Sequence, residues 1–195
     1  MDLDLVQRIA IVVVNSLILV PVGRWAVRNA NKEIRNGIPP LTWRSIVTRG
    51  FVFALMCGSS AGIFAAIFGR KYGHPIGKAL WAPIYVGILT FILGSIAFPL
   101  VQLLSERFGT IRIQYSPGEA SERLGTMQYR LGEVTRVRHL INAGLAFLSA
   151  FLAGLVTNFL MSGEINWKGA FLIGLGVFIA YFIVLTALRT GKEPD

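Results

Sequence analysis

Five long stretches of the chain are rich in apolar residues and nearly free of charge, and polar segments separate them. A helix rises about 1.5 Å per residue, so crossing a hydrocarbon core of about 30 Å takes roughly 20 residues. The predicted spans are residues 5–22, 50–68, 79–104, 141–161 and 170–188. The pattern therefore predicts an all-α, polytopic membrane protein in which residues 1–195 form a single integral membrane domain.

The composition supports the same class. Hydrophobic residues make up 54% of the 195 residues and charged residues only 15%, which is too little polar surface to cover a soluble globule of this size. The first span could instead be a cleaved signal peptide. However, Asp2 and Asp4 precede it and no small-residue cleavage site follows it, so we expect a retained helix.

The basic residues are distributed unequally between the two sides of the predicted bundle. Of the 19 lysines and arginines, 14 lie in the connections 23–49 and 105–140 and in the tail. The other five are Arg8, Arg70, Lys71, Lys78 and Lys168. The positive-inside rule therefore predicts cytoplasmic loops at 23–49 and 105–140, a cytoplasmic C-terminus and an external N-terminus, in a bacterial inner membrane. We expect the basic face to attract anionic lipids of the bilayer and not nucleic acid.

Small side chains recur at every fourth position of the second and fourth spans, 92 residues apart. These residues are Ala54, Gly58, Gly62 and Ala66 in the second span, and Ala146, Ala150, Gly154 and Asn158 in the fourth. Such ridges let helices approach closely in lipid, so we predict helix-packing surfaces and expect Gly174 to tolerate a larger side chain better than Gly62 or Gly154. The match favours a parallel repeat of two helical hairpins, spans 2–3 and 4–5; the alternative is coincidence, because Gly and Ala are common in membrane helices.

Asn15 and Asn158 are the polar residues within the spans whose burial in lipid costs most. We expect each to form a hydrogen bond with a neighbouring helix, and contact with a solute is the alternative. No carboxylate lies well inside a span, which argues against proton-coupled transport. Arg8 is close enough to the start of the first span for its side chain to reach the membrane surface.

The connection after the third span contains a predicted helix that begins near Ser116-Pro117. Its apolar stripe is formed by Leu124, Met127, Leu131 and Val134, and its basic border by Arg123, Arg130 and Arg136. Two interpretations remain open. The helix lies on anionic headgroups, or it docks against another chain.

No residue pattern predicts a catalytic centre, a metal site or a bound cofactor, so an enzyme is not expected. A membrane enzyme whose site a partner or the loop arginines complete is a distant alternative. The favoured function is a helix-packing or scaffold subunit of a homo-oligomer or larger membrane complex. The main alternative is a small-solute transporter or channel at the repeat interface, which a water-accessible cavity reaching Asn15 or Asn158 at mid-depth would favour.

Overall fold

The computed structural model describes residues 3–36, 41–69, 75–107, 140–159 and 163–190. These residues form five helices. They are α1 (Leu3–Asn36), α2 (Trp43–Gly69), α3 (Ile76–Arg107), a fourth helix (Leu140–Phe159) and α5 (Trp167–Thr190). The protein is therefore all-helical over the residues that the structure describes.

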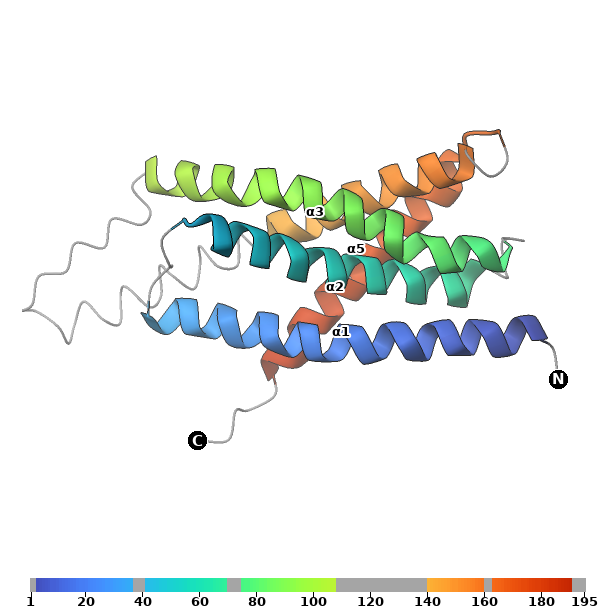
Figure 1. Ribbon diagram of the computed structural model, residues 1–195, viewed down its shortest axis with the longest axis horizontal. Helices are drawn as coiled ribbons and strands as arrows, with labels where there is room; N and C mark the ends of the chain where they lie inside the picture. The colour runs from blue at the N-terminus through green and yellow to red at the C-terminus, as the bar shows by residue number, and fades with distance from the viewer. Residues whose placement is uncertain (1–2, 37–40, 70–74, 108–139, 160–162, 191–195) are drawn as a thin grey trace, which may run out of the picture.

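The helices pack as a bundle and alternate in direction along the chain (Figure 1). The starts of α1, α3 and α5 lie at one end, together with the ends of α2 and the fourth helix. We call this the N-terminal end of the bundle. α2 occupies the centre, since 56% of its most apolar stretch is buried, against 22% for α1 and 17% for α3.

Four helices are long and apolar enough to cross a membrane, namely α1, α2, α3 and the fourth helix. Large apolar side chains cover their outward faces, including Val13, Leu17, Ile88, Ile92 and Ile96, each at least 50% exposed. Such a surface suits lipid and not water. Whether α5 also spans the membrane is not shown, so a five-span count stays a prediction.

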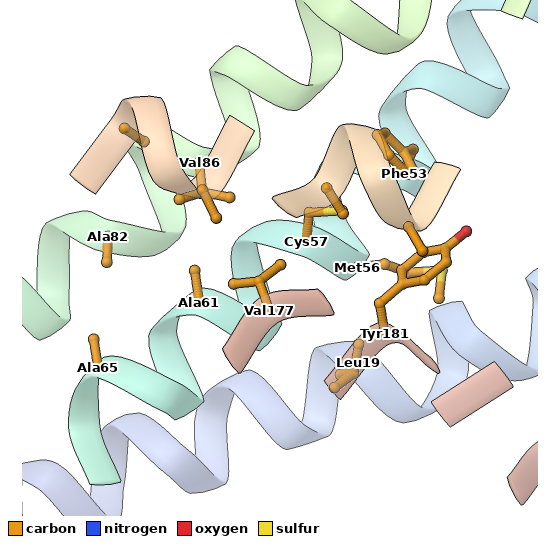
Figure 2. Close-up of a cluster of buried hydrophobic side chains, with 14 of the residues drawn as sticks. Leu19, Phe53, Met56, Cys57, Ala61, Ala65, Ala82, Val86, Val177 and Tyr181 are labelled. Carbon is orange, nitrogen blue, oxygen red and sulfur yellow. The ribbon is translucent and has the colours of Figure 1, made fainter. Parts of the chain in front are cut away.

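The core of the bundle is built mainly from small side chains. Cys57 and Ala61 of α2 lie beside Val86 of α3 and Val177 of α5 (Figure 2), and all four are at most 1% exposed. Larger groups fill the part of the core nearer the start of α2, where the Phe53 ring meets Tyr181 edge to face at a centroid distance of 5.9 Å. Because most core residues are small, the helix backbones themselves come close together.

Exposed tryptophans lie toward both ends of the bundle. Toward the N-terminal end, Trp81 of α3 is 50% exposed and Trp167 of α5 is 59% exposed. Toward the opposite end, Trp25 of α1 is 39% exposed and Trp43 of α2 is 79% exposed. Tryptophan favours the headgroup level of a bilayer, because its ring is apolar and its N–H group is polar. The distribution is typical of a helical bundle that spans a membrane.

Candidate functional site

Three helices meet around Gly62 of α2. A methyl group on Gly62 would lie 2.6 Å from Pro83 Cγ of α3 and 2.8 Å from Asn15 Nδ2 of α1. One turn earlier, a methyl group on Gly58 would lie 2.5 Å from the backbone oxygen of Pro83. Only glycine leaves room for contacts this close, so this part of the predicted ridge lies directly against α1 and α3.

The fourth helix packs on α5 in a similar way. A methyl group on Gly154 would lie 3.0 Å from Ala170 Cα, and one on Gly174 would lie 3.0 Å from the backbone oxygen of Phe147. Gly174 is therefore packed as closely as Gly154, contrary to the expectation that it would tolerate a larger side chain better than Gly154, whereas the contact at Gly62 is closer than both. Gly144 has no atom within 4 Å of such a methyl group.

All eight residues of the two predicted ridges are buried. In each hairpin the ridge of the first helix faces the second helix, with Gly62 against Pro83 and Gly154 against Ala170. Pro83 and Ala170 are not equivalent under the offset of 92 residues, so the parallel repeat stays a prediction. The predicted stripe and its arginines, Arg123, Leu124, Met127, Arg130, Leu131, Val134 and Arg136, lie outside the described residues.

Asn15 is buried beside Gly62, but its amide bonds within its own helix. Asn15 Nδ2 donates to the backbone oxygen of Ile11 at 2.8 Å. The expected hydrogen bond to a neighbouring helix is absent among the described residues. The reason is that Gly62, the residue of α2 that faces the amide, has no side chain with which the amide could form a hydrogen bond.

A groove of about 610 Å³ runs between α1 and α3 beside Asn15. Its walls are formed by Gln7, Ala10, Ile11, Val14 and Asn15 of α1, and by Ile76, Ala79, Leu80 and Pro83 of α3. Val14 and Leu80 are each 55% exposed, so the groove opens to the outside of the bundle. We call it the α1–α3 groove.

Lys78 lies on a different face of α3 and reaches the fourth helix. Lys78 Nζ donates to Asn158 Oδ1 at 2.8 Å, and Asn158 Nδ2 donates to the backbone oxygen of Asn166 at 3.4 Å. Asn166 in turn caps α5, since Gly169 N donates to Asn166 Oδ1 at 2.9 Å. This chain of hydrogen bonds connects α3, the fourth helix and α5.

Asn158 is only 2% exposed, and its side chain forms a hydrogen bond to another helix, namely to Lys78 of α3. It does not lie at mid-depth, however, because the chain bends at Gly163 and Glu164, five and six residues later. Its side chain therefore belongs to the N-terminal end of the bundle. The sequence indicates Lys78 only as one of the few charges on the less basic side, and no local pattern points to Asn166.

A pocket of about 40 Å³ lies beside this hydrogen-bond chain. Lys78, Ala82 and Val86 line it from α3, at intervals of four residues that place them on one helix face. The facing walls come from α2, the fourth helix and α5, and they include Phe64, Phe68, Ala153, Thr157, Asn158 and Leu172. A buried water needs about 10–15 Å³, so this space, which we call the Lys78 pocket, holds only a small group.

Arg8 is also drawn into the bundle at this end. Its Nε donates to Asp4 Oδ2 at 2.8 Å, and its Nη1 lies 3.5 Å from the backbone oxygen of Ala66. The residue is only 7% exposed, because its side chain turns toward α2. The spacing of four between Asp4 and Arg8 is the sequence signal that could have predicted the pair.

A second ion pair joins α1 and α2 at the opposite end of the bundle. Arg49 Nη2 lies 2.7 Å from Glu33 Oε1, and the two side chains are 16% and 18% exposed. In the sequence, Arg49 is only one of the 14 basic residues on the more basic side. No pattern within either helix predicts the pair, because it depends on how α2 turns back along α1.

Comparisons with protein families, with curated proteins and with solved structures give no match to this chain. Within the part of the chain that the structure describes, no group of three or more His, Cys, Asp or Glu side chains could hold a metal ion. The argument about function therefore depends on the α1–α3 groove, the Lys78 pocket and the glycine contacts.

Proposed function

We propose that this chain is a five-span inner-membrane protein that acts as a helix-packing subunit of a homo-oligomer, with its N-terminus outside and its C-terminus in the cytoplasm. The charge distribution supports the orientation. In the described helices, Arg24, Arg28, Lys32, Arg44 and Arg49 lie in the half of α1 and α2 away from the N-terminal end. The rule that cytoplasmic segments are basic then places the N-terminal end outside.

The observation that carries the assembly proposal is the amide of Asn15 in the α1–α3 groove. Its nitrogen bonds to Ile11, whereas no described residue donates to its oxygen. Hydrocarbon chains cannot form hydrogen bonds, so a helix that brings a donor suits this groove better than lipid does.

A second copy of the chain supplies such a helix. Two copies inserted with the same orientation are related by a two-fold axis along the membrane normal, so residues at equal depth meet. The groove face of α1 carries two amides, the exposed Gln7 and Asn15, and an amide both donates and accepts. This face is therefore complementary to itself.

Cysteine cross-linking in native membranes tests the proposal. Cys57 is the only cysteine of the chain, so Cys57→Ala gives a background in which Val14→Cys reports on the groove. The control is Phe171→Cys in α5, which lies near the same end and is 50% exposed, against 55% for Val14. We expect a disulfide-linked dimer for Val14→Cys only. Equal yields for both variants, or no dimer for Val14→Cys, would remove the groove as the interface.

One observation supports the transport alternative, namely that the Lys78 pocket reaches Asn158. The pocket is small and lies near one end of the bundle, and the α1–α3 groove opens sideways, toward lipid. Neither space forms a path across the described helices, so the packing subunit is the function that we favour.

A further inference from the structure

Three exposed cations form a stripe along the half of α1 that lies away from the N-terminal end of the bundle. Arg24, Arg28 and Lys32 follow one another at intervals of four residues, and all three are exposed. Val27 and Ala30 on a neighbouring face of α1 are only 7% and 8% exposed, because that face packs on the bundle. The three cations, which we call the α1 basic stripe, therefore lie on a face that is open to the surroundings.

The acidic residues of α1 and α2 do not offset the charge of this stripe. The two helices contain only two acidic residues, Asp4 and Glu33. Asp4 lies at the N-terminal end of the bundle, and the charge of Glu33 is compensated by Arg49 of α2 at 2.7 Å. Like charges four residues apart repel each other on a helix surface. The α1 basic stripe therefore attracts anionic groups from outside these two helices.

The stripe begins at the level of the lipid headgroups. The apolar part of α1 ends at Val22, and Trp25, next to Arg24, is 39% exposed, as is typical of a tryptophan at the membrane interface. A rise of about 1.5 Å per residue places the Arg28 backbone about 9 Å beyond Val22, and the headgroup region is roughly 5–8 Å thick. Because the Cα–Cβ bonds of a helix tilt toward its N-terminus, the Arg28 side chain leans back toward the hydrocarbon core. Arg24 and Arg28 can therefore reach lipid phosphate groups, and Lys32 follows one turn farther out.

Arg44 at the start of α2 provides a contrast to Arg28. It is also exposed and lies at the same end of the bundle, but α2 runs in the direction opposite to α1. Its Cα–Cβ bond therefore tilts away from the hydrocarbon core. A general attraction between a basic end and an anionic surface would involve Arg44 as much as Arg28, whereas direct contact with phosphate groups favours Arg28.

We propose that the α1 basic stripe binds the phosphate groups of anionic membrane lipids, with the guanidinium groups of Arg24 and Arg28 contacting the phosphate oxygens. A guanidinium group suits this contact, because two of its N–H groups can donate to one phosphate at once. The binding does not depend on the proposed dimer. Only the assignment to the cytoplasmic leaflet rests on the proposed orientation, so reporter fusions and lipid vesicles test the two proposals separately.

Quenching of Trp25 fluorescence tests the stripe in the full-length protein. The reference protein keeps Trp25 and carries phenylalanine at the other three tryptophans, Trp43, Trp81 and Trp167. It is reconstituted into phosphatidylcholine vesicles that contain equal shares of either brominated phosphatidylglycerol or brominated phosphatidylcholine. Bromine quenches tryptophan only at short range, so the ratio of the two responses measures the preference for anionic lipid beside Trp25. We expect a preference of about fivefold or more, which corresponds to about 1 kcal/mol from a single basic residue at an anionic surface.

Arg28→Gln in this reference protein should lower the preference by about threefold or more, and the matched control Arg44→Gln should leave it nearly unchanged. Salt at about 1 M should also lower it, because the Debye length falls to about 3 Å. Equal losses in the two variants would mean that the whole basic end attracts lipid and would overturn the stripe as the site. No preference in the reference protein would overturn the assignment to lipid. If Arg28→Gln does not fold, Arg24→Gln takes its place, because it removes the other proposed contact.

Discussion

The side-chain amide of Asn15 in α1 occupies the space beside Gly62 of α2, where an added methyl group would lie 2.8 Å from the Asn15 nitrogen. The two residues are far apart in sequence, and each makes the position of the other possible. A larger residue at 62 would push α1 away from the centre of the bundle. The amide, in turn, fills a site at which glycine alone would leave a void.

Gly62→Ala should destabilise the bundle, because the methyl group would overlap with both Asn15 and Pro83. Overpacking of this kind costs about 1–3 kcal/mol. Gly174→Ala should behave similarly against the backbone of Phe147. Thermal unfolding in detergent measures both effects.

Gly144→Ala is the control for these variants. Gly144 is exposed and has no neighbour within 4 Å of an added methyl group. The free energy of unfolding of the Gly144→Ala variant should therefore equal that of the wild type or be slightly higher. If Gly144→Ala lowers the free energy of unfolding as much as Gly62→Ala does, helix glycines matter for a reason other than close packing.

The Glu33–Arg49 pair should contribute to stability more than an ordinary surface ion pair. Both side chains are less than one fifth exposed, so water screens the interaction only in part. We expect Arg49→Ala to lower the free energy of unfolding by about 1–2 kcal/mol, which lies between the values typical of exposed and of buried ion pairs. The exposed Arg44→Ala should cost little by comparison.

A double-mutant cycle with Glu33→Gln and Arg49→Gln isolates the pair from other contacts of Glu33. A coupling energy near zero would mean that the two side chains act independently. The prediction for Arg49 would then fail, even if the single variant is destabilised.

Local signals explain which parts of the fold could be predicted. The described part of α1 ends at Asn36, and the sequence continues with Gly37 and the prolines at 39 and 40; glycine caps a helix and proline cannot extend one, so this end matches a local signal. The apolar stretches likewise indicated an all-helical chain with several long helices. These features depend on neighbours in sequence, so sequence analysis can find them.

The contacts of the candidate site depend on tertiary packing and could not be predicted in the same way. Lys78 and Asn158 are 80 residues apart, and their hydrogen bond requires a particular arrangement of the two hairpins. Arg8 had two possible directions near the start of its helix, outward to the surface or inward to Ala66. The observed inward direction depends on the partner Asp4 and on the backbone of α2.

The proposed orientation predicts where reporters are active. An alkaline phosphatase fusion after Gly163 should be active, because the connection before α5 would lie outside, and a fusion at the C-terminus should be inactive. A fluorescent protein that matures only in the cytoplasm should give the opposite pattern. Activity of the phosphatase at the C-terminus would contradict either the number of spans or the orientation.

Thiol accessibility at Thr157 separates a packing subunit from a transporter. Thr157 is 8% exposed and lines the Lys78 pocket, so a cysteine there reports which side of the membrane the pocket can reach. In the Cys57→Ala background, Thr157→Cys should react with a membrane-impermeant thiol reagent only from outside. A packing subunit has no state in which this pocket opens toward the cytoplasm, whereas alternating access requires one. Ile165→Cys, exposed near the same end, controls for labelling from outside. Labelling of Thr157→Cys from both sides, with Ile165→Cys labelled from outside only, would favour the transporter over the packing subunit.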